Sequence, residues 1–309
     1  MSSNGATPPQ TPGSRLRALL ADETQILVCP GVYDGFSARI VLNTGHFSAL
    51  YMTGAGSTMS MLGTADLGLT TLTEMAANAS MIAGLDPCVP LIADADTGFG
   101  GPLNIRRTTH AYARGGVAGF HIEDQVTTKR CGHLGGKELV GEDVFQARIR
   151  AAKLAREEIG SDVVIIARTD ALASLGYDAA ISRLRAAIAA GADVAFLEAL
   201  QTKEQMERAC KDLAPTPVLL NMVESGRTPT VTPEEARELG FRVMIFPVFT
   251  LGPVYTAVKG AAEELHKYGK VKSREGDGIG PKELFEVCGL KESVEFDERS
   301  GGVAYKNGV

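Results

Sequence analysis

The stretch Pro90-Leu-Ile-Ala-Asp-Ala-Asp96 joins a short, unbroken apolar run to two carboxylates. An apolar run without alternation is typical of a strand buried on both faces, as in a parallel sheet covered by helices. Seven similar runs follow the same pattern, at residues 26–29, 49–52, 119–122, 163–167, 194–197, 218–220 and 243–246. The sequence therefore predicts eight buried parallel strands.

Helical segments alternate with these runs. Phe145, Ile149 and Ala152 have the spacing of one helix face, and Gly160 would end that helix. The segment before Gly191 has the same spacing. Eight β-then-α units favour a closed (β/α)8 barrel over a doubly wound open sheet, the weaker alternative. No Rossmann glycine fingerprint follows the first run, which also counts against the open sheet.

Composition sets the class of protein. The chain has 309 residues, enough for one such barrel with extensions, and a net charge of −6. This charge gives no sign of a nucleic acid or an anionic membrane as partner. No apolar run approaches the roughly 20 residues that span a bilayer. We therefore expect an enzyme with a small-molecule partner.

Five cysteines occur at wide, irregular spacing and without a C-x-x-C pair. This pattern predicts neither a disulfide framework nor a structural zinc site and fits a reducing compartment. The first residues lack the apolar segment of a secretory signal and the arginines of a transit peptide. We therefore expect the protein in the cytoplasm.

The chain divides into three expected parts. These are a disordered tail at residues 1–14, the catalytic barrel at 15–268, and a linker with a helical extension at 269–309. In the extension, Pro281 and Gly289 frame a short helix whose apolar face carries Leu284, Phe285 and Cys288. A tethered apolar helix needs a surface to cover, either on its own barrel or on a neighbouring subunit.

Acidic residues follow two neighbouring runs. Asp94 and Asp96 follow the third run and Glu123 follows the fourth, and the active site of a (β/α)8 barrel forms where its strands end. Their carboxylates suit Mg²⁺ or Mn²⁺. Asp66, in a glycine-rich loop after the second run, can join them through metal-bound water. The alternative is that these acids cap helices or hold loop backbone.

Other polar residues end the remaining runs. Arg168 follows the fifth run and can clamp a carboxylate with two hydrogen bonds. Glu198 and Asn221 follow the sixth and seventh, and Thr53 follows the second; Asn221 and Thr53 can hydrogen-bond a metal-bound group. A structural role at the barrel rim is the alternative for Arg168, Asn221 and Thr53. His121 is expected inside the barrel rather than in the catalytic group.

Residues 123–137 form the most reactive segment. Cys131 lies there among the cations Lys129, Arg130 and His133, which would favour its thiolate. The glycines around it would let the segment move over a ligand. We predict a lid that carries an acid or base, the alternative being an exposed basic loop that happens to contain a cysteine.

With these residues identified, the chain resembles the isocitrate lyase/phosphoenolpyruvate mutase superfamily from about Arg15 to Val309. Six segments carry the resemblance: Pro30-Gly-Val-Tyr-Asp34, Tyr51-Met-Thr-Gly-Ala-Gly56, Asp66-Leu-Gly68, Asp94-Ala-Asp-Thr-Gly-Phe-Gly100, Glu123-Asp-Gln125 and Lys129-Arg-Cys-Gly-His133. It implies a magnesium-dependent barrel, with manganese as a substitute, that acts on 2-hydroxy or 2-oxo dicarboxylates. It also implies a C-terminal helix swapped between subunits of a homo-oligomer, a dimer of helix-swapped dimers.

The resemblance also implies roles for single residues. Asp94 would bind the metal, with Asp66, Asp96 and Glu123 around it through water, and Cys131 would be the proton donor. The implied catalytic group is Cys131, His133, Lys129, Arg168 and Glu198. The implied substrate-binding group is Tyr51, Thr53, Gly54, Ala55, Gly56, Gly132, Arg168, Asn221 and Pro247.

The lid narrows the reaction within this superfamily. Its Cys-Gly-His is typical of the carbon–carbon bond lyases, and the phosphonate mutases and hydrolases lack it. Methylisocitrate lyases usually continue with Arg-Pro, whereas this chain has Leu134-Gly-Gly136, which favours a smaller or more apolar substrate. The lid is most similar to the branch that contains 2,3-dimethylmalate lyase and oxaloacetate hydrolase.

Pro247 distinguishes between the lyase and the hydrolase of this branch. It matches a position where the hydrolases tend to carry serine, and proline cannot donate the hydrogen bond that a hydrated carbonyl would need. We therefore predict a 2-alkylmalate lyase that forms a 2-oxo acid such as pyruvate and a short carboxylic acid. The alternatives are an oxaloacetate hydrolase giving oxalate and acetate, a methylisocitrate lyase, and a non-catalytic binding protein on the same barrel.

Overall fold

Eight parallel strands close into a barrel in the computed structural model, which describes residues 10–132, 134–224, 226, 228–271 and 279–305. The strands are β1 (Leu27–Val32), β2 (Leu50–Met52), β3 (Leu91–Asp94), β4 (Gly119–Glu123), β5 (Val164–Thr169), β6 (Val194–Leu197), β7 (Val218–Asn221) and β8 (Val243–Phe246). Leu27 of β1 pairs with Val243 of β8, which closes the barrel. All eight predicted strands and the (β/α)8 class are confirmed.

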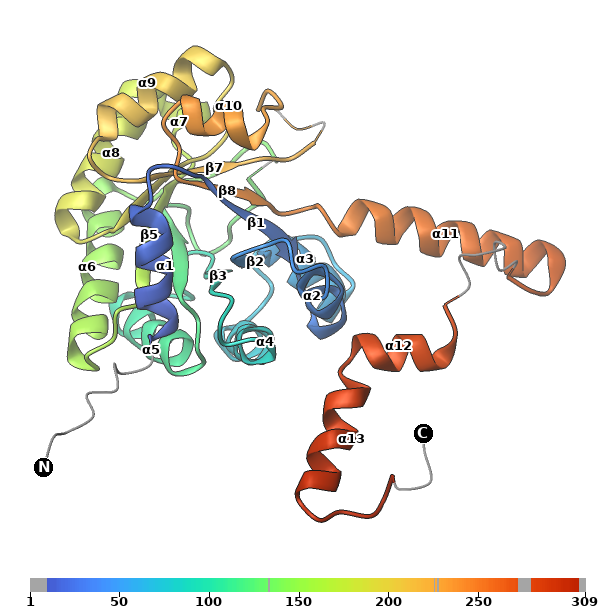
Figure 1. The fold of residues 1–309 in the computed structure, drawn as a ribbon. Coiled ribbons are helices and arrows are strands. Elements are labelled where there is room, and N and C mark those ends of the chain that lie inside the picture. Colours follow the sequence, from blue (N-terminus) through green and yellow to red (C-terminus); the bar gives the residue numbers. More distant parts are fainter. Residues whose placement is uncertain (1–9, 133, 225, 227, 272–278, 306–309) are drawn as a thin grey trace, which may run out of the picture.

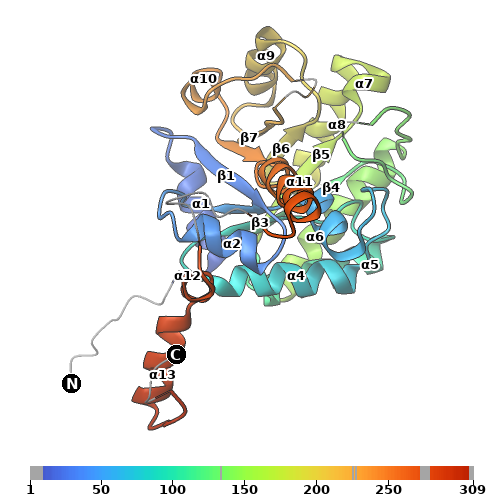
Figure 2. The same ribbon diagram turned by 90° about the vertical axis from the view of Figure 1, so that its right-hand side faces the viewer.

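Helices between successive strands surround this barrel (Figures 1 and 2). They are α2 (Gly35–Leu42), α3 (Gly54–Leu62), α4 (Leu72–Leu85), α5 (Pro102–Arg114), α6 (Glu142–Glu158), α7 (Leu172–Leu175), α8 (Tyr177–Ala190), α9 (Lys203–Leu213) and α10 (Pro233–Glu238). Phe145, Ile149 and Ala152 of α6 are fully buried, as their spacing predicts. Helix α8 ends at Gly191, whose φ of 120° suits glycine.

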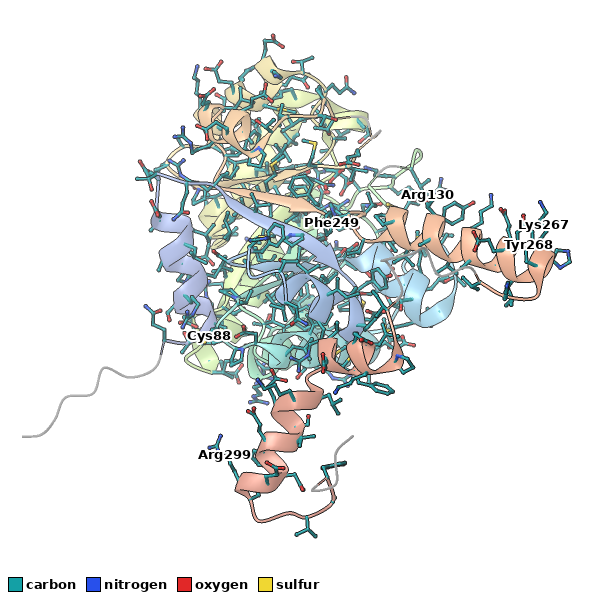
Figure 3. The ribbon with its side chains drawn as sticks, turned by 45° about the vertical axis from the view of Figure 1, so that its right-hand side comes forward. Cys88, Arg130, Phe249, Lys267, Tyr268 and Arg299 are labelled. Carbon is teal, nitrogen blue, oxygen red and sulfur yellow. The ribbon has the colours of Figure 1, made fainter. Side chains whose placement is uncertain are left out.

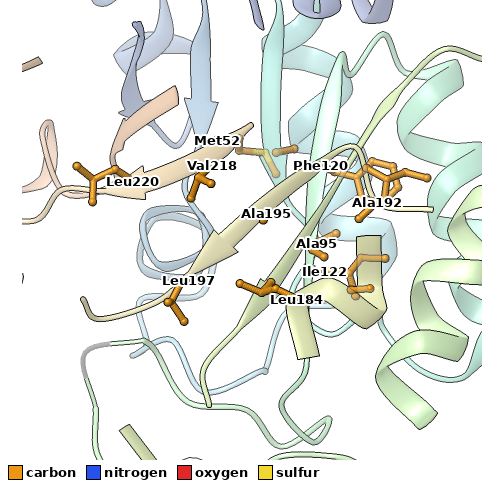
Figure 4. Packing of buried hydrophobic residues seen from close by; sticks show 14 of the residues in the cluster. Met52, Ala95, Phe120, Ile122, Leu184, Ala192, Ala195, Leu197, Val218 and Leu220 are labelled. Atoms are coloured by element: carbon orange, nitrogen blue, oxygen red, sulfur yellow. The ribbon is translucent and has the colours of Figure 1, made fainter. Parts of the chain in front are cut away.

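Side chains of each strand alternate between two apolar clusters. Ile165 belongs to the outer cluster between sheet and helices, whereas Ile166 belongs to the inner cluster within the barrel. Figure 4 shows the outer cluster, in which Phe120 and Leu184 are packed. Because both faces of the sheet are buried, the strands read as unbroken apolar runs rather than as alternating ones.

Helix α1 (Pro12–Ala21) closes the end of the barrel where the strands begin. Its Leu16 and Leu20 belong to the inner cluster, and the Thr11 side chain caps it by accepting from the Ser14 N–H at 3.1 Å. Residues 12–14, which we expected in the tail, are therefore helical. The Pro12 ring suits the first turn of a helix, and Thr11 supplies the cap. Residues 1–9 lie outside the described part.

Three helices follow β8: α11 (Leu251–Tyr268), α12 (Pro281–Val287) and α13 (Leu290–Arg299). Helix α11 leaves the barrel (Figures 1 and 2), whereas α12 lies beside α2, where Asn43 Nδ2 donates to the Val287 carbonyl oxygen at 3.1 Å. Within the described chain none of the three contains a buried residue, and Tyr255 and Val258 are 67% and 63% exposed. The short helix from Pro281 forms as predicted, and its apolar face is exposed in the single chain.

Helix α13 was not predicted as a separate element. Part of the linker predicted between α11 and α12, residues 272–278, lies outside the described residues. Among the described helices, none combines the length and the apolar character that crossing a bilayer requires.

Candidate active site

The strand ends bring the predicted site residues together around one pocket. Those that line it are Tyr51, Thr53, Ala55, Asp66, Asp94, Cys131, Gly132, Arg168, Asn221 and Pro247. The other described candidates, namely Gly54, Gly56, Asp96, Glu123, Lys129 and Glu198, contact these lining residues. His133 lies outside the described residues. The gathering follows from the barrel, because all carboxyl ends of parallel strands meet at one face.

Helix α3 starts at the edge of this pocket. Thr53 caps it by accepting from the Gly56 N–H at 3.3 Å. A Cβ atom on Gly54 would lie 2.3 Å from Asp94 Oδ2, so only glycine lets the first turn approach this carboxylate. The positive end of α3 therefore lies against Asp94.

Two acids from different loops, Asp66 between α3 and α4 and Asp96 after β3, surround an ammonium group. Lys129 Nζ lies 2.6 Å from both Asp66 Oδ1 and Asp96 Oδ1. The Asp96 N–H donates to Asp94 Oδ1 at 2.8 Å, and Asp96 adopts a φ of 46°, an unusual value for aspartate. We expected Lys129 as a cation beside the thiol of Cys131, whereas its ion pairs are made with two carboxylates.

Burial and mutual repulsion perturb these acids. Burial raises the pKa of Asp96 to about 6, with Lys129 opposing the rise and Asp94 and Asp66 adding to it. Burial also raises the pKa of Glu123 well above its usual range. Burial opposes the charge of Lys129, but the surrounding carboxylates hold its pKa well above the usual value. Four acids, namely Asp66, Asp94, Asp96 and Glu123, thus act on this one ammonium, so the acids outnumber the cation that compensates them.

This charge excess and the all-oxygen donor set fit a divalent cation such as Mg²⁺. As placed here, no three His, Cys, Asp or Glu side chains among the described residues converge closely enough to form a ready metal-binding group. The predicted metal ligands Asp94, Asp96, Asp66 and Glu123 therefore share one region of the site, and their role as ligands stays a prediction.

Arg168 is held rigidly on the other side of the pocket. Its Nε donates to Asp170 Oδ2 at 3.0 Å and its Nη2 to Asp170 Oδ1 at 3.2 Å. Nη1 lies 3.2 Å from Glu123 Oε2, and the guanidinium lies over the Phe196 ring at 5.2 Å. Burial opposes its charge, but Asp170, Glu123 and Glu198 hold the pKa of Arg168 well above its usual value. It is a fixed cation suited to a carboxylate.

Asp170 was missed in the sequence analysis. Its signal was present in Arg168-Thr-Asp170, where an acid follows a cation by two residues and therefore points to the same side of the chain. We placed the end of the fifth strand at Ala167, so the acid appeared to be a loop residue.

The lid lies over the pocket. Cys131 lines it, and the Cys131 N–H donates to the Asp66 carbonyl oxygen at 3.2 Å. A Cβ atom on Gly132 would lie 2.7 Å from Arg168 Nη2 and 2.9 Å from Glu198 Oε1, so a larger residue would push the lid away. Arg130 lies on the side of the molecule from which α11 departs (Figure 3). The lid position of Cys131 that we predicted is thus compatible with contact to a bound molecule.

An apolar wall completes the pocket. Phe196, Val223, Ile245 and Val248 line it together with Pro247. Of these five, only Pro247 was among our candidates. The others were missed because an apolar residue at the end of a strand has the same sequence pattern as one in the core.

Tyr51 and His121 lie deeper at the same face. The Tyr51 hydroxyl is 2.9 Å from His121 Nε2, and burial lowers the pKa of His121 to about 4. The imidazole is therefore neutral near pH 7. Burial also raises the pKa of Tyr51 well above its usual value, so its hydroxyl keeps its proton. His121 is fully buried, as expected for an interior histidine.

The pocket lies at the mouth of a (β/α)8 barrel and combines a fixed arginine, a group of carboxylates and an apolar wall. These features are typical of an enzyme for a small anionic molecule. The family model described as Phosphoenolpyruvate phosphomutase matches residues 16–266. The chain therefore belongs to this family, within the phosphoenolpyruvate mutase/isocitrate lyase superfamily, and the resemblance seen in the sequence is confirmed.

Relatives of this chain include lyases, a hydrolase and phosphomutases. A crystal structure of 2,3-dimethylmalate lyase is 52% identical, with a TM-score of 0.94, covering 98% of this chain and 99% of that chain. Oxaloacetate acetylhydrolase in complex with the inhibitor 3,3-difluorooxalacetate is also 52% identical, with a TM-score of 0.92 and coverage of 96% and 99%. The 2-methylisocitrate lyase of Aeropyrum pernix is 38% identical over 97% of this chain and 93% of its own length.

Proposed function

We propose that this protein is a lyase of the 2-alkylmalate type, which cleaves 2,3-dimethylmalate or a close analogue into pyruvate and propionate. The observation that carries the proposal is the mixed lining of the pocket, which combines the charged groups of Arg168 and Asp94 with the apolar side chains of Phe196, Ile245 and Pro247. A dialkylated malate needs both kinds of lining, because its carboxylates require polar partners and its methyl groups gain from apolar burial.

The acids of the site would hold Mg²⁺, with Mn²⁺ as a substitute. Asp94 would bind it directly, and Asp66, Asp96 and Glu123 would bind it through water. When bound, the metal polarises the C1 carboxylate and C2 hydroxyl of the substrate as a Lewis acid and eases loss of the hydroxyl proton. Carboxylate oxygens and excess negative charge are what this ion requires, which supports the assignment.

The substrate is oriented by groups on both sides of the pocket. Arg168 binds one carboxylate through its guanidinium, held in place by Asp170. The N–H groups of Gly54 and Ala55 at the start of α3 stabilise the oxo-acid end, because the first N–H groups of a helix have no partner within it. Asn221, whose Nδ2 donates to Glu198 Oε2 at 3.1 Å, completes this polar side.

Cys131 supplies the proton. A base at the rim takes the C2 hydroxyl proton, the C2–C3 bond breaks, and its electron pair moves to C3 of the departing acid. The Cys131 thiol then protonates C3, so that the acid leaves as propionate and pyruvate remains. The lid that carries Cys131 and Gly132 excludes water from the carbanion during this step.

The C-terminal helices α11–α13 would join subunits. Their exposed apolar residues, Tyr255, Val258 and Leu265 among them, need a surface that the single chain does not offer. Exchange of these helices in a homotetramer, a dimer of helix-swapped dimers, would bury them. Light scattering on the full chain and on residues 1–250 tests this: a full-length monomer would contradict it.

The alternative reaction is hydrolysis of oxaloacetate to oxalate and acetate. It is favoured by the similarity to oxaloacetate acetylhydrolase, which equals that to the lyase in sequence identity. Pro247 speaks against it, because its ring cannot donate a hydrogen bond to a hydrated carbonyl.

A product assay by NMR decides between the reactions. With Mg²⁺ present, 2,3-dimethylmalate, 2-methylisocitrate and oxaloacetate are offered separately. We expect pyruvate and propionate from 2,3-dimethylmalate. Oxalate and acetate as the main products would make the protein a hydrolase, succinate from 2-methylisocitrate would make it a methylisocitrate lyase, and no product at all would indicate a binding protein.

A single substitution tests the argument from Pro247. In Pro247→Ser the new hydroxyl restores a donor at the pocket wall. We expect the ratio of oxaloacetate hydrolysis to dimethylmalate cleavage to rise in this variant. An unchanged ratio would remove Pro247 as the residue that selects the reaction.

A further inference from the structure

The far end of the lid carries a second buried lysine. Lys137 lies six residues beyond Cys131, its side chain is only 7% exposed, and its Nζ lies 2.6 Å from Asp170 Oδ1. A lysine is seldom buried without a charged partner, because its ammonium loses hydration. The ion pair with Asp170 therefore offsets the loss of hydration of the Lys137 ammonium.

That carboxylate is the one that orients Arg168. Asp170 Oδ1 accepts from both Lys137 and Arg168 Nη2, and Oδ2 accepts from Arg168 Nε. The Asp170 N–H donates to Asp124 Oδ1 at 2.9 Å, which fixes the backbone beneath the carboxylate. Asp170 thus connects Lys137 of the lid to the Arg168 guanidinium that lines the pocket.

The near end of the lid is anchored separately. Gln125, which is fully buried, donates from Nε2 to the Arg130 carbonyl oxygen at 2.9 Å and accepts the Arg130 N–H at 3.0 Å. The same Nε2 lies 2.9 Å from Glu123 Oε1. The lid is therefore held on both sides of Cys131 in the sequence, by the hydrogen bonds of Gln125 before it and by the ion pair of Lys137 after it.

The charge of Lys137 also matters for an anionic ligand. Asp170 faces Arg168 with a full negative charge, and in a buried site such a charge offsets the attraction of the guanidinium for a substrate carboxylate. A lysine that arrives with the lid compensates Asp170. The attraction of Arg168 for the substrate is then greatest when the lid is closed.

We propose that Lys137 is a positioning residue that couples lid closure to substrate binding. The closed lid places its ammonium on Asp170, and Asp170 holds Arg168 in the orientation that grips the carboxylate. The role of the substrate in this proposal rests on the proposed lyase function. The coupling itself is independent of turnover, so it can be measured with oxalate, a small dianion, as the probe.

The first test compares Lys137→Met with Lys137→Arg. Loss of a buried charge-assisted pair should raise KM for 2,3-dimethylmalate and Kd for oxalate at least about tenfold, with a smaller change in kcat. Lys137→Arg should restore most of both. The control is Lys211→Met, which removes an exposed ion pair of the same 2.6 Å length, to Glu207 on α9, and should change neither.

The second test asks whether Lys137 acts through Asp170. In an Asp170→Asn background, Lys137→Met should have little further effect on Kd for oxalate, because the partner is already removed. If the two substitutions instead raise Kd for oxalate by independent factors, which multiply in the double variant, the proposal is overturned. An unchanged Kd and KM in Lys137→Met alone would overturn it as well.

The third test follows the lid without any ligand. Arg130 is exposed, so tryptic cleavage after it, measured by mass spectrometry, reports opening of the lid. We expect this cleavage to be faster in Lys137→Met and close to wild type in Lys137→Arg. Equal rates in all three would overturn the coupling. If 2,3-dimethylmalate is not cleaved but oxalate binding and proteolysis respond as expected, the proposed function fails and the coupling stands.

Discussion

The two ends of this barrel are built from opposite kinds of residue. Where the strands begin, Leu16 and Leu20 of α1 pack on the inner cluster, and the interior there is apolar. Where the strands end, Asp94, Glu123 and Arg168 are just as deeply buried, but they are charged. The first end gains stability from burial, whereas the second must compensate the desolvation of each charge.

This difference separates stability from activity along the same eight strands. Residues at the closed end can be optimised for packing, because the predicted catalytic groups all lie at the other end. Residues at the mouth are arranged for a ligand, and burial raises the pKa of Asp96 and Glu123, so the charges of these two acids are incompletely compensated by the fold. Substitutions at the two ends should therefore affect different measurements.

The largest effect is expected from Cys131→Ala at the mouth. Loss of the proton donor should lower kcat at least about 10³-fold while oxalate binding stays largely intact, and Cys131→Ser should behave alike. Steady-state kinetics and calorimetry measure the two quantities. Cys88→Ala is the control, since Cys88 is exposed and far from the lid (Figure 3). A Cys131→Ala enzyme with nearly full rate would refute the assigned role.

At the closed end, Leu16→Ala should act on stability alone. Leu16 is fully buried, so the substitution should lower the free energy of unfolding by about 2–5 kcal/mol and leave kcat unchanged at 25 °C. Urea unfolding measures this. Leu154→Ala on α6 is the matched control, because Leu154 is 64% exposed and should cost less than about 0.5 kcal/mol. A large fall in kcat would break the separation between the two ends.

Asp96→Asn should change how stability depends on pH in the metal-free protein. The pKa of Asp96 is about 6 in the folded state against a usual 3.8, so the folded state binds the proton more readily. Relative to the variant, the wild type should therefore gain up to about 3 kcal/mol as pH falls from 7 to 4. Unfolding in urea with a chelator present tests this, and parallel curves for both proteins would contradict it.

The smallest effect is expected from Thr11→Ala at the start of α1. Loss of the cap should lower the free energy of unfolding by about 1 kcal/mol, without a change in kcat. Thr11→Ser keeps a hydroxyl and should restore most of the stability in a thermal or urea melt. No difference between alanine and serine would mean that the cap contributes nothing to the closed end.

The strands were predictable because both of their faces are buried. Residues 163–167 and 243–246 contain almost nothing but apolar side chains, and this pattern is typical of a covered parallel sheet. The polar residues that end them were equally visible. Once eight units are counted, barrel geometry alone brings Asp94 and Arg168 to one face.

The remaining features depend on contacts between distant parts of the chain. The apolar wall around Phe196 and Ile245 has the composition of a core strand, and only the closed barrel shows that it faces a pocket. Lys129 had the sequence context of a cation beside a thiol, but its partners Asp66 and Asp96 come from two other loops. The ion pair between Lys137 and Asp170, which links the lid to the carboxylate that holds Arg168, is visible only in the folded structure.

The sequence by itself determined the class of fold and the family, and it predicted the reactive groups, because these depend on local periodicity and on short motifs. Only the tertiary structure decided which charges compensate one another, which apolar residues face the pocket and how the lid is held. Those features depend on distances between side chains far apart in the sequence, such as Lys129 and Asp66, which are 63 residues apart, and the order of residues along the chain does not contain such distances.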